Sequence, residues 1–191
     1  MSHFFAYLSR LKHINRWNLM RNVTRENVME HTCECAMIAH SLVTIQNTRY
    51  GGNLSAERAV SLALFHEVGE VITGDMATPI KYFNPQIRKA FGEIEKIAER
   101  KLCDMLPKDL RPGYEMLILR GNEEPEWIYV KAADRICAYL KCLDELKSGN
   151  AEFAKAAEST HASIIEMEIE AVKDFMLEFA PSYSLPLDEL N

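Results

Sequence analysis

The sequence lacks several features that would assign it at once to a common class of protein. No run of about 18 uncharged apolar residues occurs, so no segment is predicted to span a membrane. Glycine-rich nucleotide-binding loops and the G-x-S-x-G turn of serine hydrolases are also missing. Five cysteines in 191 residues is an odd and small number, which argues against a disulfide framework and favours reduced thiols in the cytoplasm. The cysteines are therefore interpreted as core packing residues.

Strand-like alternation, internal repeats and flexible linkers are absent as well. Apolar residues instead recur at helical spacing, beginning with Phe4, Leu8 and Leu11. With 48% hydrophobic and 26% charged residues, the chain has enough apolar side chains for a packed core, so disorder is not predicted. The sequence predicts one all-α domain over residues 1–191.

Acidic residues are missing from the first 25 positions, which hold five basic residues. The formal net charge of −6 therefore divides into +5 for residues 1–25 and −11 for the remainder. An acidic chain is a poor scaffold for a nucleic-acid polymer. The basic segment lacks the apolar core of a secretory signal and is predicted to be an amphipathic first helix of the fold. A mitochondrial presequence is the less favoured alternative.

Capping and helix-breaking residues set the expected helix boundaries. Asn27 and Glu30 form a capping pattern before a helix that is expected to end ahead of Gly51. Between Met29 and Ile45 this helix is apolar on most faces, which predicts a central, buried helix. Further helices are expected over residues 56–70, 85–105, 126–147 and 151–180, with a loop over residues 73–85.

Two histidines stand out because each lies in an apolar helix beside a carboxylate. His31 follows Glu30, and His66 precedes Glu67 in the segment FHEVGE. His66 and Glu70 are expected to share one helical face, with Glu67 about 100° round the helix. A lone histidine on an apolar face is more often a core residue than a ligand, but the adjacent carboxylates favour a site. The spacing does not match the H-E-x-x-H motif of zinc proteases.

Other polar residues are explained by structure alone when each is taken by itself. Asp134 interrupts an apolar helix and is interpreted as a surface partner of Lys131 or Arg135. Glu158 and His161 form a single Glu-x-x-His pair, whereas a ferritin-like di-iron site needs two such pairs. These two residues are expected on a solvated helix face.

Four segments carry a resemblance to a known family. They are SHFFAYLSRLKHINRWNLMRN, the pair Glu30-His31, TGDMATPIKYFN and KAADRICAYLKCLDEL. Together with the order His31, His66-Glu67, Asp134, they resemble the HD-domain metal phosphohydrolases and, among these, the YfbR-like bacterial 5′-deoxynucleotidases. The resemblance covers residues 2–190.

This resemblance implies an all-helical HD fold, one divalent metal ion and a homodimer. It implies that the chain hydrolyses deoxyribonucleoside 5′-monophosphates to deoxynucleoside and phosphate with metal-activated water. The implied metal ligands are His31, His66, Glu67 and Asp134, a set that suits Co, Mn or Zn better than Ca. Glu70 would be the catalytic carboxylate beside the attacking water.

The resemblance also implies a substrate-binding set. Arg16 would orient the phosphate and act in catalysis, and its charge would help to offset the acidic body of the protein. Trp17 either lines the nucleotide site or only anchors its own loop. The implied substrate-binding residues are Arg16, Trp17, His31, Glu67, Asp75, Met76, Ala77, Thr78 and Asp134.

Residue 67 departs from the family pattern, which has His-Asp where this chain has His66-Glu67. A Glu side chain ligates the same metals, but its carboxylate reaches one methylene further. The alternative hypothesis is therefore a catalytically impaired nucleotide-binding protein of HD type. A third hypothesis keeps the enzyme and changes the substrate to a modified nucleotide or another small phosphomonoester.

Overall fold

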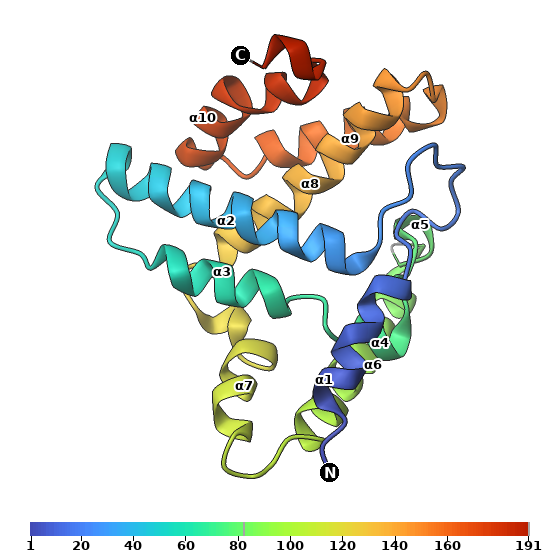
Figure 1. Ribbon diagram of the computed structural model, residues 1–191, viewed down its shortest axis with the longest axis vertical. Coiled ribbons are helices and arrows are strands. Elements are labelled where there is room, and N and C mark those ends of the chain that lie inside the picture. Colours follow the sequence, from blue (N-terminus) through green and yellow to red (C-terminus); the bar gives the residue numbers. More distant parts are fainter. Residues whose placement is uncertain (82, 191) are drawn as a thin grey trace.

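The computed structural model describes residues 1–81 and 83–190, and most of these residues lie in helices (Figure 1). Their β-structure is limited to one isolated bridge between Asn15 and Asn27. The all-α prediction is therefore confirmed. Tyr82 and Asn191, which the predicted domain 1–191 includes, lie outside the described residues.

The α-helices are α1 (Phe4–Leu8), α2 (Val28–Tyr50), α3 (Ala56–Phe65), α4 (Glu70–Thr73), α5 (Thr78–Lys81), α6 (Pro85–Asp104), α7 (Arg111–Ile118), α8 (Trp127–Lys147), α9 (Ala154–Ile165) and α10 (Glu170–Glu178). Short 3-10 helices are η1 (Ser9–His13), η2 (Gly121–Glu123), η3 (Ala151–Phe153), η4 (Ala180–Ser184) and η5 (Leu187–Glu189). In the part of the chain that the structure describes, none of these helices is long and apolar enough to cross a bilayer.

Helix α2 occupies the centre of the molecule, as its apolar faces predict. It packs against α3, α8 and α10, and Figure 1 shows α3 and α10 on opposite sides of it. Its side chains Leu42 and Val43 are fully buried in the largest core cluster, which they share with residues of those three helices. The helix that bears His31 is thus fixed by packing on several sides.

The N-terminus of α2 is held by the predicted capping box. The Asn27 side chain accepts hydrogen bonds from the N–H groups of Met29 at 3.1 Å and Glu30 at 3.0 Å. The Glu30 carboxylate accepts one in return from the N–H of Asn27 at 3.1 Å. These bonds satisfy N–H groups that the first helical turn leaves unpaired, and they fix the turn that precedes His31.

The helix predicted over residues 56–70 ends at Phe65, so the prediction is wrong for its last turn. Residues 66–69 form a turn, and α4 begins at Glu70. The physical reason is that the two halves pack into different cores. Leu62 belongs to the largest cluster, whereas Val68 packs with Phe4 in a second cluster. His66 and Glu70 therefore do not share a face of one continuous helix.

The single helix predicted over residues 151–180 is instead two helices, α9 and α10. The chain reverses between them at Glu168, which has a left-handed backbone with φ of 53°. This reversal folds α10 back onto α2. Asn150, which precedes this segment, caps η3: its side chain accepts a hydrogen bond from the N–H of Glu152 at 3.3 Å.

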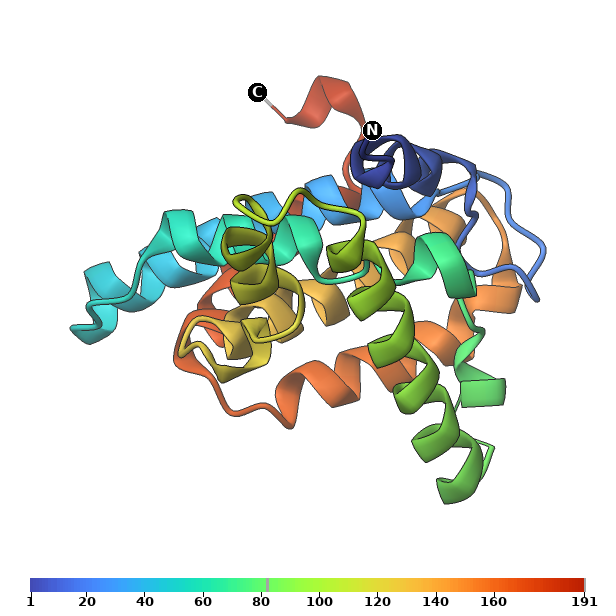
Figure 2. The same ribbon diagram turned by 90° about the horizontal axis from the view of Figure 1, so that it is seen from below.

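Three smaller expectations also need correction. The basic segment of residues 1–25 forms only α1 and η1 and then a loop, because the chain must reach the start of α2. The loop predicted over residues 73–85 contains the short helix α5. Cys33 is exposed, while the other four cysteines are buried. Figure 2 shows helix α6, which follows the segment of residues 73–85, projecting from the remaining helices.

Candidate metal centre and cleft

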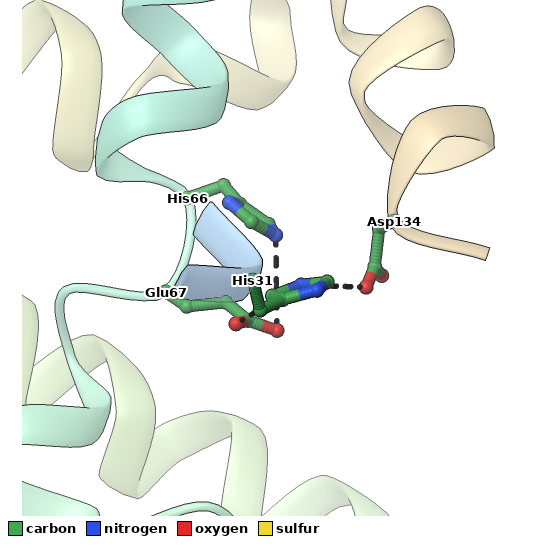
Figure 3. A group of neighbouring side chains, drawn as sticks. All are labelled: His31, His66, Glu67 and Asp134. Atoms are coloured by element: carbon green, nitrogen blue, oxygen red, sulfur yellow. Dashed lines mark ion pairs between the residues drawn. The ribbon is translucent and has the colours of Figure 1, made fainter. Parts of the chain in front are cut away.

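Four side chains from three parts of the chain converge on one point (Figure 3). His31 comes from α2, His66 and Glu67 from the turn after α3, and Asp134 from α8. One potential ligand atom from each residue lies within 4.8 Å of the others. His31 Nε2 lies 3.4 Å from Glu67 Oε2 and 3.3 Å from Asp134 Oδ1. The break between α3 and α4 turns Glu67 toward this point.

The hydrogen bonding of His66 fixes which ring nitrogen faces the cluster. Its Nδ1 lies 2.6 Å from the carbonyl oxygen of Ala63. A carbonyl can only accept, so Nδ1 carries the proton and Nε2 presents a free lone pair. Burial lowers the pKa of His66, which favours this neutral form. Metal-binding histidines are commonly oriented by such a bond on the opposite nitrogen.

Both carboxylates of the cluster are held in the ionised form. Burial by itself would raise the pKa of Glu67, but the neighbouring His31 and the positive charge of Arg16 outweigh burial and lower it. Burial likewise opposes ionisation of Asp134, and His31 and Lys131 hold its pKa well below its usual range. The cluster therefore offers two anionic oxygens beside two imidazole nitrogens.

Several of these atoms lack a hydrogen-bond partner among the described residues. They are His31 Nε2, His66 Nε2 and Glu67 Oε2, and all three are buried. A buried polar atom without a partner is costly and calls for an explanation. A divalent cation at the centre of the cluster would satisfy all three. Two imidazoles and two carboxylates form a donor set that fits Zn, Co or Mn.

Arg16 lies beside the cluster on the loop that leads into α2. Its Nη1 pairs with Glu26 Oε2 at 3.0 Å, and its Nη2 lies 4.0 Å from Asp134 Oδ1. Asp134 also lies 3.7 Å from Lys131 Nζ, so the surface pair expected from the sequence exists alongside the cluster. Arg135 instead donates to the carbonyl oxygen of Ser163 at 2.8 Å.

An open cleft of about 1280 Å³ leads to the cluster. Arg16 and Trp17 line it together with Glu70, and so does the whole segment of residues 75–78. His66, Glu67 and Asp134 lie in its wall, whereas the fully buried His31 lies behind them. The structure thus brings every implied site residue either to the cleft or directly behind it.

Trp17 both anchors its loop and lines the cleft, so the two interpretations left open by the sequence are compatible with each other. Its ring packs against Phe153, with centroids 5.3 Å apart, and the residue also lines the cleft. Its backbone has a left-handed φ of 57°. Because this conformation is unfavourable for a residue with a side chain, the loop needs other contacts to hold it.

Sequence reasoning missed the part of the cleft wall that helix α6 contributes. Helix α6 lines it with Arg88, Gly92, Lys96 and Arg100, which recur every four residues and so lie along one side of the helix. This spacing is visible in the sequence, but it does not reveal what the row faces. Glu99 of α6 also lines the cleft. Its burial, and to a lesser extent the negative charge of Glu95, raise the pKa of Glu99 to about 7.

Comparison with solved structures places the fold in a known class. An HD-domain phosphohydrolase from Listeria innocua superposes with a TM-score of 0.84 at 24% identity, over 95% of this chain and 88% of that chain. The HD phosphohydrolase of cyanophage S-2L, solved with dA and one catalytic Zn²⁺ ion, superposes with a TM-score of 0.65 at 16% identity, over 93% and 95% of the two chains. The fold is that of the HD-domain phosphohydrolases.

Sequence comparison narrows this class to one family. The model of the family described as 5′-deoxynucleotidase YfbR-like matches residues 3–183. A 5′-deoxynucleotidase of Vibrio cholerae is 48% identical over 191 residues, covering 100% of this chain and 98% of its own. One of Yersinia pestis strain Pestoides F is 50% identical over 192 residues, covering 100% and 98%. The chain belongs to the YfbR-like 5′-deoxynucleotidase family, which confirms the resemblance seen in the sequence.

Proposed function

We propose that the protein is a metal-dependent phosphomonoesterase that hydrolyses deoxyribonucleoside 5′-monophosphates to deoxynucleoside and phosphate. The observation that carries this proposal is the cluster of His31, His66, Glu67 and Asp134. It lies at the wall of a cleft of about 1280 Å³, which is large enough to hold a nucleotide. Membership of the family supports the substrate class.

The metal centre follows from the same cluster. His31, His66, Glu67 and Asp134 would hold one divalent ion such as Co, Mn or Zn. When bound, such an ion lowers the pKa of a water molecule toward 7 and offsets the negative charge of a phosphate. Without a cation, the ionised Glu67 and Asp134 would repel that phosphate.

The remaining chemistry is assigned to side chains that line the cleft. The planar guanidinium of Arg16 suits two phosphate oxygens, and its pairing with Glu26 holds it toward the cluster. Glu70 lines the cleft close to Glu67 in the chain, where it would take or return a proton. Residues 75–78, Asp75, Met76, Ala77 and Thr78, would form the wall against sugar and phosphate, with Trp17 beside them.

The position of Glu67 argues against the impaired alternative. Its two carboxylate oxygens lie 3.4 Å from His31 Nε2 and 3.7 Å from His66 Nε2. The longer side chain therefore still reaches both imidazoles, because the residue follows the end of α3. A metal-binding test separates the two cases. Wild type and Glu67→Asp are expected to retain one ion per chain after dialysis, and Glu67→Gln to lose it; an ion-free wild type would favour the impaired protein.

A substrate panel tests the proposed specificity. Metal-loaded protein is expected to release phosphate from deoxyadenosine monophosphate much faster than from adenosine monophosphate or from a non-nucleotide phosphomonoester. Excess chelator should abolish the release. Equal rates on the ribonucleotide would contradict deoxyribose selection, and a preference for the non-nucleotide ester would favour the third hypothesis.

The wider setting of the enzyme is proposed on the family resemblance. We propose that residues 1–191 act as one HD-type domain, that two copies form a homodimer, and that the enzyme works in the cytoplasm on free nucleotides. The absence of a bilayer-spanning helix among the described residues is compatible with this setting. Sedimentation of the purified protein at micromolar concentration tests the dimer.

A further inference from the structure

Three polar side chains near the end of α8 are buried away from the metal centre. Glu145 is fully buried, and Lys141 and Asn150 are each 7% exposed. Lys141 and Glu145 form an ion pair. Asn150 Nδ2 donates to Glu145 Oε2 at 2.8 Å and to the carbonyl oxygen of Arg21 at 2.7 Å. Burying charged groups is costly unless partners satisfy them, so their partners show what these residues hold.

The two charged side chains bind the backbone of a distant loop. Glu145 accepts hydrogen bonds from the N–H of Val23 at 2.8 Å and from the N–H of Thr24 at 3.0 Å. Lys141 Nζ donates to the carbonyl oxygen of Thr24. These partners lie more than 100 residues earlier in the chain. The C-terminal end of α8 therefore holds the tip of the loop between η1 and α2 by hydrogen bonds. Figure 1 shows this loop on the same side of the molecule as that end of α8.

The same loop carries Arg16 and Trp17. Its base is closed by a hydrogen bond from the N–H of Arg16 to the carbonyl oxygen of Glu26 at 3.0 Å. A second bond joins the N–H of Val28 to the carbonyl oxygen of Ile14 at 2.9 Å. The loop is therefore held by hydrogen bonds both at its base, beside Arg16, and at its tip.

Lys141 also supports the aromatic ring on which Trp17 packs. Its Nζ lies 5.7 Å from the centroid of the Phe153 ring, which contacts Trp17. A cation at this distance from an aromatic face is attracted to it. One buried cation therefore touches both the loop tip and the anchor of Trp17, whose left-handed backbone needs such support.

The helix that grips the loop also supplies part of the metal centre. Asp134, Lys141 and Glu145 are separated by seven and four residues on α8. At about 100° per residue, Lys141 and Glu145 leave the helix within roughly 20° of the direction of Asp134, one on each side of it. One face of one rigid helix thus fixes both an acid of the cluster and the loop that brings Arg16 to it.

We infer that Lys141, Glu145 and Asn150 form a positioning cluster that holds the Arg16–Trp17 loop so that Arg16 meets the phosphate opposite the metal centre. This inference rests on the proposed function, in which Arg16 binds the phosphate. Apolar packing could stabilise α8 equally well, whereas a buried ionic group can select one conformation among several. The cluster would act through Arg16, without touching the substrate.

The test compares Glu145→Gln with wild type and with Val172→Ala as a matched control. Val172 is a buried residue of α10 in the largest core cluster, so its truncation weakens the fold without touching the loop. Opening of the loop is read by native-state trypsin cleavage after Arg21 or Arg25. Asn150→Ala is a second, milder variant that removes the bonds to Arg21 and Glu145 if Glu145→Gln does not fold.

Release of the loop should appear in cleavage and in substrate binding together. In the Glu145 or Asn150 variant we expect cleavage at least tenfold faster and KM for deoxyadenosine monophosphate at least tenfold higher, with kcat changed less than threefold. Val172→Ala should change neither the cleavage rate nor KM. Unchanged cleavage in both loop variants, or faster cleavage with unchanged KM, overturns the inference.

Failure of the proposed function would look different. A metal-loaded wild type that releases no phosphate from any deoxyribonucleotide removes the proposed activity but leaves the loop measurable. In that case the affinity for deoxyadenosine monophosphate, read by fluorescence of Trp17 in a Trp127→Phe background, replaces KM. The same tenfold weakening in the loop variants supports the positioning role, and unchanged affinity overturns it.

Discussion

At the scale of single residues, the site contains buried polar atoms that have no hydrogen-bond partner among the described residues and that a cation would satisfy. The His66 ring is set by Ala63 so that Nε2 faces inward, and Glu67 Oε2 is buried without a hydrogen bond among the described residues. Both arrangements are explained when the inward atoms are metal ligands.

Glu70 is the residue whose replacement most cleanly separates binding from chemistry. Glu70→Ala should lower kcat between about 100-fold and 10,000-fold, the usual range for loss of a general acid or base. Its metal content should stay at the wild-type value, because Glu70 is not one of the four cluster residues. Initial rates and metal analysis of the same sample check both statements.

An exposed carboxylate gives the control for this variant. Glu93 lies on the exposed surface of α6, and Glu93→Ala should leave kcat unchanged. A Glu70→Ala enzyme that retains its full rate would remove Glu70 from the mechanism.

The four cluster residues could be named from the sequence, but the residues that support them could not. Histidines beside carboxylates and the resemblance were enough to name the cluster residues. Glu26 and the trio Lys141, Glu145 and Asn150 were not foreseen. A Lys–Glu pair four residues apart is typical of a solvated helix face. Only the fold shows that the pair Lys141–Glu145 is buried.

At the scale of elements, α2 and α8 carry the site because both are long and packed on several sides. The bounds of α2, α6 and α8 were predicted closely, since caps and breakers mark their ends. The helices over residues 56–70 and 151–180 were predicted too long. The break at Glu168 contains neither Gly nor Pro, and Gly69, in the turn of residues 66–69, keeps a helical backbone. Both breaks arise because successive segments pack into different core clusters or fold back on the core.

The capping box of α2 should make a measurable contribution to stability. Asn27→Ala removes the acceptor for two N–H groups and is expected to lower the free energy of unfolding by about 1 kcal/mol. Asn27→Asp keeps an acceptor at the same position and should change it little. Urea unfolding monitored by circular dichroism measures both, and equal stability of Asn27→Ala and Asn27→Asp would contradict a capping role.

The junction between α8 and the loop should make stability depend on acid pH. Burial raises the pKa of Glu145, but Lys141, the loop N–H groups and Asn150 outweigh burial and lower it from 4.5 to about 2. A lowered pKa stabilises the folded state above pH 4.5, and this contribution, about 3 kcal/mol, is lost as the pH falls toward 2.

Urea unfolding of wild type and Glu145→Gln at several pH values tests this dependence. The stability difference between the two proteins should be largest near pH 7 and should shrink steadily below pH 4.5. A difference that stays constant down to pH 2.5 would show that Glu145 does not titrate in this way.

At the scale of the whole molecule, a metal ion would tie separate parts of the fold together. His31, Asp134 and the turn bearing His66 and Glu67 belong to different elements, whereas the largest core cluster joins α2, α3, α8 and α10 without using these four side chains. The fold is therefore expected to persist without metal, but at lower stability. The cleft could not be predicted from the sequence, because the segments that line it are far apart in the chain and no motif connects them.

Metal removal should lower the melting temperature without removing the helices. An ion present at a hundred times its Kd adds about 2.7 kcal/mol, which corresponds to roughly 5–10 °C for a chain of this size. Thermal unfolding of metal-loaded and chelator-treated protein measures the shift, with far-ultraviolet circular dichroism at 20 °C as the check on helicity. An identical melting temperature in both samples would argue against a metal site built from three elements.

The central claim, a metal centre that hydrolyses deoxyribonucleotides, is tested most directly by reconstitution. Phosphate release from deoxyadenosine monophosphate would be measured for metal-stripped protein with Co²⁺, Mn²⁺ or Zn²⁺ added back, beside Glu67→Asp. Wild type is expected to regain turnover with at least one of these ions. Turnover by Glu67→Asp alone would mean that Glu67 has silenced an otherwise intact site, and no turnover by either protein with any ion would contradict the account.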